Sequence, residues 1–171
     1  GDEDFELDTR LLAMLGRSFP LPEYVGMRQQ WNGFARTLGQ YFGQYDLYLC
    51  PTTAQPPARI GELDLPPAMQ MVSKLLVRAR AGKLMLKTGI VDQLAMESLA
   101  RTPFTQLANL TGTPAISLPL GWSDAGLPVG VQFGAPHGEE GRLLQLAAQL
   151  EEATPWYSRY ETLWNDGFGE N

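Results

Sequence analysis

The segment Phe104–Trp122, FTQLANLTGTPAISLPLGW, constrains the fold more than any other part of this sequence. Its first half has the spacing of a short apolar helix that begins near Pro103 and runs through Leu110, and Gly112 is placed to cap the helix C-terminus. The apolar run that follows, AISLPL, predicts a buried strand. The chain is therefore expected to pass directly from a helix into a strand at this point.

A second strand follows the first after a short turn. The sequence SDAG at Ser123–Gly126 carries a turn signal, and LPVGVQFGAP after it predicts the returning strand. Two strands joined by so short a connection pair most simply as an antiparallel hairpin.

The rest of the chain alternates helical and strand patterns. Helical spacing is found at residues 7–16, 31–42, 69–100 (broken near Gly82 and again near Gly89) and 138–154, and YDLYLCP predicts a short buried strand that ends at Pro51. Residues 51–67 hold five prolines and predict an irregular loop. This mixture predicts an α/β fold with a mixed β-sheet flanked by helices.

Charge and composition exclude several classes of partner. The formal net charge of −6 disfavours nucleic acids and anionic membrane surfaces, because both are bound through clustered Lys and Arg. No run reaches the roughly 18 continuous apolar residues of a transmembrane helix. The single cysteine, Cys50, cannot form an internal disulfide, so we expect a cytoplasmic protein. The chain does not begin with Met, so we expect that it was either processed or cut from a longer protein.

Two side chains are candidates for independent chemistry. His137 is the only histidine, and a catalytic histidine needs a nucleophile to deprotonate or further metal ligands. The alternative interpretation is a loop residue ahead of the last helix. Cys50 has no neighbouring cation in sequence that would lower the pKa of its thiol, so it is interpreted as a small apolar side chain. The residues alone therefore indicate a scaffold without a complete catalytic set.

Several spaced motifs resemble the C-terminal part of amidase-signature enzymes. They are NLTGTPAISLP, then GLPVGVQ, then the closing helix LLQLAAQLE, preceded by YDLYLCPTTAQPPARIGEL and FELDTRLLAMLGRSFPLPEYVGMRQQW. The resemblance implies that residues 1–171 are the C-terminal region of one amidase domain. It also implies hydrolysis of amide bonds by a serine nucleophile, a second serine on a cis peptide and a lysine base, without any cofactor or metal. These groups belong to the family's N-terminal half, so we expect no catalytic residue here and an inactive fragment.

The resemblance also implies which residues approach the substrate. The turn Cys50–Pro51–Thr52 and the stretch before the Phe104 helix, which holds Arg101 and Thr102, are expected to line the cleft for a small-molecule amide. The branch of the family that transfers ammonia from glutamine has an acidic residue in the stretch before this helix. Arg101 and Thr102 therefore favour a general amidase with an apolar substrate.

Two other functions remain open at this point. The chain could be a non-catalytic binding or partner subunit that retains the amidase fold, or an independent enzyme that uses Cys50 or His137. We also expect apolar surface, rich in Leu and Met, to be covered by a homodimer contact or by a rearranged helix in residues 69–100.

Overall fold

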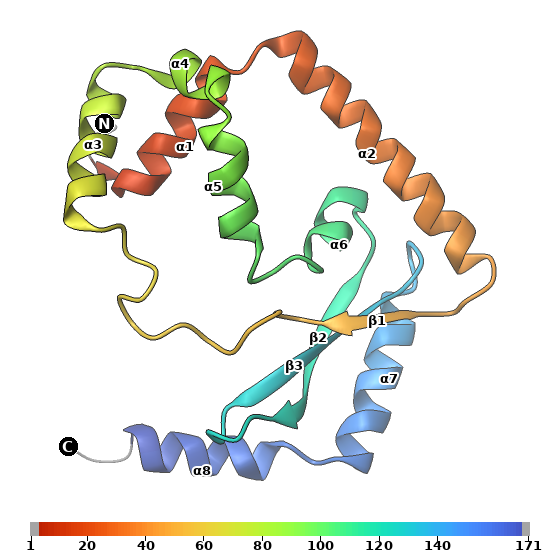
Figure 1. Cartoon of the computed structure of the whole chain (residues 1–171). Helices are drawn as coiled ribbons and strands as arrows, with labels where there is room; N and C mark the ends of the chain where they lie inside the picture. The colour runs from red at the N-terminus through yellow and green to blue at the C-terminus, as the bar shows by residue number, and fades with distance from the viewer. Residues whose placement is uncertain (1–3, 169–171) are drawn as a thin grey trace. The chain divides into compact units, whose positions relative to one another are not determined.

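The structure is a computed structural model that describes residues 4–168, shown in Figure 1. Eight helices and three strands are assigned within these residues, in the order α1 Leu7–Ser18, α2 Leu21–Phe42, β1 Tyr48–Pro51, α3 Pro67–Arg78, α4 Gly82–Lys87, α5 Ile90–Leu99, α6 Gln106–Thr111, β2 Ala115–Trp122, β3 Pro128–Gly134, α7 Glu140–Ala153 and α8 Tyr157–Phe168. The chain forms two compact units, one of residues 1–30 and 57–101 and one of residues 31–56 and 102–171. Each unit is described separately.

The second unit is built on a three-stranded sheet in the order β1-β3-β2. The expected hairpin is confirmed, since β2 pairs antiparallel with β3 and places Ser117 opposite Gln132. β1 pairs antiparallel with the other edge of β3, with Cys50 also opposite Gln132. The α/β class with flanking helices is confirmed. Among the described strands both pairings are antiparallel, so the parallel pairing that a mixed sheet would contain is not found there.

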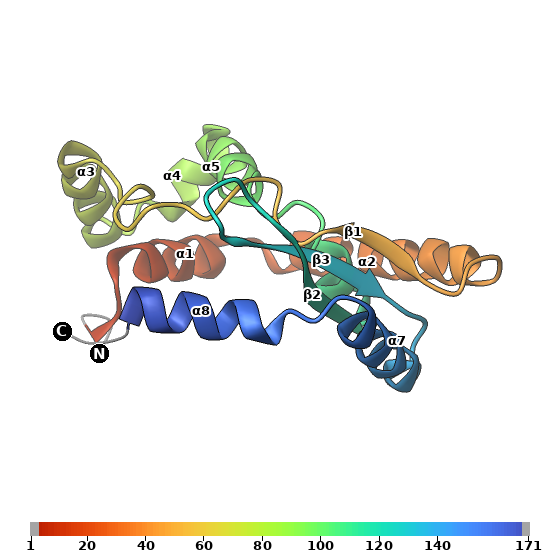
Figure 2. The same ribbon diagram turned by 90° about the horizontal axis from the view of Figure 1, so that it is seen from below.

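One face of this sheet forms the core with α7. Leu118 and Phe133 from the strands and Leu143 from α7 are buried together, with Ala135 fully buried beside them. Figures 1 and 2 show α7 lying along one side of the strands. The amphipathic helix predicted for residues 138–154 is therefore confirmed, because the apolar stripe of α7 faces the sheet.

The helix that leads into β2 ends as the sequence predicts. Gly112 has φ 71°, the left-handed conformation, and its N–H donates to the carbonyl oxygen of Ala108. Glycine adopts this conformation without the steric cost that a Cβ would bring. Thr113 and Pro114 then follow, and β2 begins at Ala115.

The first unit is a cluster of four helices around Met14, Leu15 and Met85. The predicted breaks in residues 69–100 are confirmed, because α3, α4 and α5 are separate helices. Gly82 at the start of α4 lies so close to α1 that a Cβ there would overlap Ser18 and lie 2.9 Å from the carbonyl oxygen of Met14. A glycine is therefore required for the two helices to pack at this distance.

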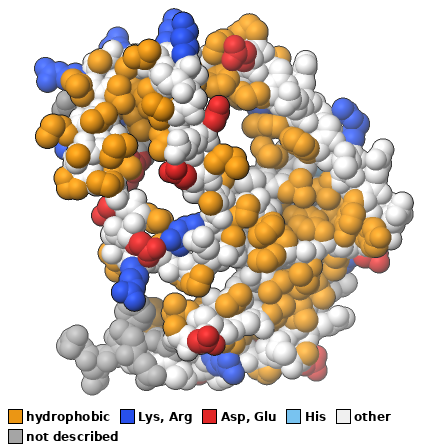
Figure 3. All heavy atoms as spheres, in the orientation of Figure 1, with side chains coloured by type: hydrophobic (Ala, Val, Ile, Leu, Met, Phe, Trp, Pro, Cys, Tyr) orange, Lys and Arg blue, Asp and Glu red, His pale blue; other side chains and the backbone are white. Residues whose placement is uncertain are grey.

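A set of large apolar side chains remains exposed on α3, α4 and α5. Met71 and Met96 are 73% and 74% exposed. Figure 3 shows hydrophobic side chains gathered over α3 at the upper left of the view. The members of this apolar surface are Met69, Met71, Val72, Leu75, Leu84, Ile90, Met96 and Leu99.

Within the described residues, no helix is both long enough and apolar enough to cross a lipid bilayer. The longest helix, α2 with 22 residues, has polar side chains throughout its length.

Candidate functional site

The turn Cys50–Pro51–Thr52 lies where β1, an edge strand of the sheet, ends. Cys50 and Thr52 are half-buried and Pro51 is exposed. An edge position tolerates Pro51, because a proline has no N–H to donate to a neighbouring strand. The N–H of Thr52 donates to the carbonyl oxygen of Gly130 at 2.9 Å, so the turn stays attached to β3 after the strand itself has ended.

A pair of hydroxyl groups crosses the sheet at this turn. The Oγ1 of Thr52 and the Oγ of Ser117 are 2.6 Å apart and share a hydrogen bond. Gly130 of β3 lies between them, and a Cβ there would come within 2.7 Å of the Thr52 oxygen and 2.9 Å of the Ser117 oxygen. The missing side chain at Gly130 therefore makes room for a direct contact between β1 and β2, which are not neighbours in the sheet.

The same face of the sheet carries further polar side chains. Gln132 is buried, and its Nε2 donates to the hydroxyl of Tyr48 at 3.3 Å. The Tyr48 ring covers Gly134, where any Cβ would overlap it. Burial raises the pKa of the Tyr48 phenol, so this hydroxyl stays protonated near neutral pH. In contrast to the α7 face, this face is lined by groups that can donate and accept hydrogen bonds.

Sequence reasoning did not assign Ser117 and Gln132 to this face. The signal was present, because β-strand side chains alternate between faces and both residues sit between apolar neighbours in AISLP and GVQFG. Reading the alternation across both strands would have placed Ser117 and Gln132 on the side opposite Leu118 and Phe133.

Cys50 lies on this polar face, since it is the register partner of Gln132. Burial raises the pKa of the Cys50 thiol. A nucleophilic cysteine needs the opposite shift, because the thiolate is the reactive form. The arrangement therefore suits a thiol that stays neutral.

Arg101 and Thr102 stand at the boundary of the two units, Arg101 closing the first and Thr102 beginning a segment of the second. The Nη2 of Arg101 forms an ion pair with the Oε1 of Glu62 at 2.9 Å. The carbonyl oxygen of Thr102 accepts a hydrogen bond from the Thr105 hydroxyl at 3.3 Å. The structure thus brings Arg101 together with the 51–67 loop.

Glu62 is fixed by two donors. Its Oε2 accepts the backbone N–H of Arg59 at 2.7 Å, and this hydrogen bond, followed by the charge of Arg101, holds the pKa of the Glu62 carboxyl below its ordinary value. The carboxylate therefore stays charged in mildly acidic solution and keeps Arg101 attached to the loop.

His137 lies in the link between β3 and α7. It is exposed and lines a shallow cavity of about 280 Å³ together with Thr113, Pro136 and the end of α2. No other titratable side chain lines this cavity among the residues described. Within residues 4–168, no three side chains of the His, Cys, Asp and Glu types are grouped so that they could hold a metal ion.

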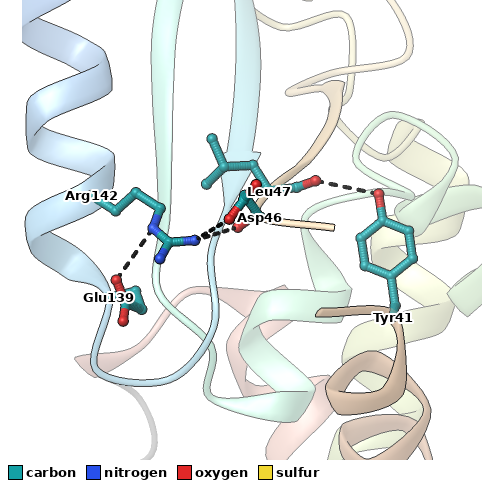
Figure 4. A network of polar contacts seen from close by, with 5 residues as sticks. All are labelled: Tyr41, Asp46, Leu47, Glu139 and Arg142. Carbon is teal, nitrogen blue, oxygen red and sulfur yellow. Dashed lines mark hydrogen bonds and ion pairs between the residues drawn. The ribbon is translucent and has the colours of Figure 1, made fainter. Parts of the chain in front are cut away.

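A polar network fixes the segment that leads into β1. Figure 4 shows Arg142 of α7 between two carboxylates, with Nη1 at 2.9 Å from the Oδ1 of Asp46 and Nε at 3.3 Å from the Oε2 of Glu139. The Tyr41 hydroxyl donates to the carbonyl oxygen of Leu47 at 3.3 Å. These contacts connect α2 and α7 to the segment that leads into β1.

The sequence model of the Amidase family matches residues 21–144, which include the polar face of the sheet and every expected substrate-facing residue. The chain belongs to the amidase family. The resemblance inferred from the motifs is thereby confirmed.

Relatives of this amidase-family chain are considerably longer than it is. AmiC of Mycobacterium leprae (strain TN) is 38% identical over 121 residues, which are 71% of this chain and 21% of that protein. The 6-aminohexanoate-cyclic-dimer hydrolase of Pseudomonas sp. (strain NK87) is 34% identical over 166 residues, 94% of this chain and 29% of that protein. The chain therefore spans less than a third of the length of these relatives.

A solved structure supports the fold of this amidase-family chain. The structure of 6-aminohexanoate cyclic dimer hydrolase superimposes with a TM-score of 0.54 at 34% sequence identity and covers 76% of this chain and 24% of that chain. The α/β architecture is thus shared with a solved hydrolase of the family.

Proposed function

We propose that this chain is the C-terminal part of an amidase, which hydrolyses carboxylic amide C–N bonds with a serine nucleophile located outside these residues. The observation that carries the proposal is the family match over residues 21–144 combined with coverage of less than a third of each relative. The resemblance assigns the nucleophile, the bridging serine and the lysine base to the N-terminal half of such enzymes. Residues 1–171 supply none of them in our interpretation.

The role we propose for this chain is to form one wall of the substrate cleft. Cys50, Pro51 and Thr52 would contact the amide substrate from the edge of the sheet, and Arg101 and Thr102 from the stretch before α6. The neutral thiol of Cys50 and the hydroxyl of Thr52 are polar without being charged, which suits an uncharged amide. Desolvating a neutral group costs far less than desolvating a charged one.

The substrate class we propose is an uncharged amide with an apolar body. A cyclic amide dimer is the first compound to test, because the matched hydrolase is named for that substrate. The Arg101–Glu62 ion pair supports this choice, since it binds the guanidinium internally and leaves less charge for an anionic substrate.

The test compares the 171-residue chain with the longer protein that its gene encodes. We expect the longer protein to cleave aliphatic or cyclic amides and to react with a fluorophosphonate, which labels activated serines. The isolated chain should do neither, at the same concentration and with native circular dichroism. Turnover or a covalent adduct on the isolated chain would overturn the proposal.

Two alternatives have different requirements. A non-catalytic partner subunit that retains the amidase fold would need a gene without an upstream serine and lysine segment, and the exposed apolar surface on α3, α4 and α5 is the feature that favours it. An independent enzyme based on Cys50 or His137 is opposed by the raised pKa of the thiol. It is also opposed by the cavity beside His137, which no second titratable side chain lines among the residues described.

For the purified chain alone we propose self-association through this apolar surface into a homodimer. In a pure solution the only macromolecule available to cover Met71 and Met96 is a second copy of the chain. We also propose a cytoplasmic location, which cell fractionation would test. The net charge of −6 disfavours nucleic-acid and membrane partners, so we propose neither.

A further inference from the structure

A hydrogen bond on the polar face of the sheet joins Thr52, which we propose to contact the substrate, to Ser117 in a different strand. The Oγ1 of Thr52, in the turn after β1, lies 2.6 Å from the Oγ of Ser117 in β2. The two residues are 65 positions apart in the sequence, and β3 lies between their strands. The family motif that places Thr52 in the cleft wall assigns no such role to Ser117.

Ser117 lies on the same face of the sheet as the substrate-facing turn. Cys50 and Ser117 are both register partners of Gln132, so the three residues form one row across β1, β3 and β2. Side chains in such a row point to one face of the sheet. Ser117 is exposed and Thr52 is half-buried. The hydroxyl pair is therefore accessible from the side on which Cys50 and Thr52 would meet a substrate.

The backbone holds the two oxygens at hydrogen-bonding distance. The N–H of Thr52 donates to the carbonyl oxygen of Gly130 at 2.9 Å, and Ser117 is part of the β2–β3 ladder. Gly130 leaves open the space between them, where a Cβ would lie 2.7 Å from the Thr52 oxygen. A threonine side chain is also stiff at χ1 because it is β-branched. What remains to be fixed is the rotation of the Thr52 hydroxyl, and the bond to Ser117 restricts it.

The pair keeps hydrogen-bonding capacity for a ligand. A hydroxyl has one O–H donor and two acceptor lone pairs, and the bond between the two hydroxyls uses one donor and one lone pair. Neither side chain makes a further hydrogen bond within residues 4–168. An O–H donor and several lone pairs are thus left. An uncharged amide has a carbonyl oxygen that accepts such a donor.

The other polar side chains of this face are less suited to orient Thr52. Gln132 is buried, and its Nε2 donates to the Tyr48 hydroxyl at 3.3 Å. The Cys50 thiol is a weak donor and a weak acceptor. Among the described residues, Ser117 is the hydrogen-bond partner of the Thr52 side chain.

We propose that Ser117 is a positioning residue for the amide substrate, which acts by orienting the Thr52 hydroxyl. The inference rests on the proposed function and adds to it a residue outside the substrate-facing turn. A group that is oriented before the substrate arrives loses less conformational entropy on binding. A contact from the cleft wall is made by the bound substrate and by the transition state alike. Its loss therefore raises KM and leaves kcat unchanged.

The test is steady-state kinetics of the longer protein that the gene encodes, with hexanamide or the cyclic amide dimer, whichever is cleaved faster. Ser117→Ala should raise KM about three- to tenfold at unchanged kcat, which is the effect of one neutral hydrogen bond. Ser117→Thr should restore KM, because threonine keeps the hydroxyl. Ser123→Ala is the matched control and should leave KM unchanged. Ser123 follows β2 in the same hairpin, and its Oγ accepts the N–H of Leu127 instead.

A double variant separates positioning from a general loosening of the sheet. Thr52→Val keeps the branched shape without the hydroxyl and should raise KM at least as much as Ser117→Ala. If Ser117 acts through Thr52, Ser117→Ala should add nothing in the Thr52→Val background, whereas independent effects on KM would multiply. Circular dichroism and the thermal midpoint confirm that each variant is folded. Ser117 is exposed, so its truncation leaves no cavity in the core.

The outcomes distinguish this inference from the proposed function. An unchanged KM in Ser117→Ala or in Thr52→Val, no rescue by Ser117→Thr, a loss of kcat instead, or multiplied effects in the double variant would overturn the inference while amide cleavage persists. Absence of amide cleavage by the unsubstituted longer protein would overturn the proposed function, and this inference with it.

Discussion

Single residues determine how the two edge strands of the sheet meet. Thr52 and Ser117 touch across β3 only because Gly130 has no side chain. The contact is built from small groups, and it joins strands that share no ladder hydrogen bonds. It is therefore sensitive to the addition of one methyl group.

The substitution Gly130→Ala should destabilise the second unit by about 1–3 kcal/mol, because the new Cβ would press on both hydroxyls and separate them. Urea unfolding followed by circular dichroism measures the change. Gly39→Ala is the control, since a Cβ at Gly39 in α2 meets nothing within 4 Å and alanine is the better helix former. An unchanged midpoint for Gly130→Ala would contradict the packing described for this glycine.

Cys50 gives a prediction about pH. Its pKa is raised by burial, so the rate of alkylation by iodoacetamide should reach half its maximum at a higher pH in the folded chain than in guanidinium. Between these two pKa values the folded state binds the additional proton, and this contribution to stability is lost as the pH rises through the folded pKa. A folded midpoint below the unfolded one would indicate an activated thiolate instead.

At the level of elements, α7 is the helix that completes the sheet. Its neighbouring leucines have opposite surroundings, since Leu143 is 3% exposed and Leu144 is 65% exposed. The two positions differ in little except the direction in which they point from the same turn. The same substitution at the two positions therefore distinguishes the contribution of core packing from that of helix propensity.

Leu143→Ala should lower the free energy of unfolding by about 2–5 kcal/mol, because it removes buried hydrocarbon and leaves a cavity against Leu118 and Phe133. Leu144→Ala should change it by less than about 0.5 kcal/mol. Both values come from denaturant titration of the isolated chain. Equal effects at the two positions would mean that α7 does not pack on the sheet through this face.

Elements with a strong local signal were predictable from the sequence. Gly112 was predicted to end a helix and to precede a strand, and in the structure it caps α6 ahead of β2. The helix α8 was not predicted, because its docking depends on a distant partner. Trp122 of β2 meets the Tyr160 ring edge-on at 6.1 Å and lies 5.0 Å from the Arg159 guanidinium. Such a contact has no signature in the segment itself.

The candidate site was predictable only in part for a similar reason. The turn Cys50–Pro51–Thr52 could be placed through the family motif, whereas its contact with Ser117 depends on strand order, which a single sequence does not state. The partner of Arg101 was likewise hidden, because Glu62 lies in an irregular loop 39 residues away. Whether these residues bind substrate stays a prediction.

At the level of the whole molecule, the exposed apolar surface on α3, α4 and α5 is the feature with consequences in solution. Soluble monomers rarely expose contiguous apolar patches above about 300–600 Å². This chain exposes several methionines and leucines on successive helices. The chain covers less than a third of the length of these relatives.

Sedimentation velocity should therefore show a monomer that converts to a dimer as the concentration rises. The double substitution Met71→Glu and Met96→Glu should shift the chain toward monomer, because burying two carboxylates in an apolar contact is costly. Lys83→Glu and Lys87→Glu form the control, since they change charge on exposed positions of α4 without removing apolar surface. A monomer at every concentration in the unsubstituted chain would contradict the homodimer.

The order of the strands has a consequence for biosynthesis. β1 leaves the ribosome long before β3, its neighbour in the described sheet, because its pairing partner Gly134 lies far downstream of Tyr48 in the sequence. Closing a loop of this length costs conformational entropy, and distant pairings form late in folding. The β2–β3 hairpin is local and can form first, as a template onto which β1 is added. Nascent chains that stop before Pro128 would carry β1 without the described strand that pairs with it.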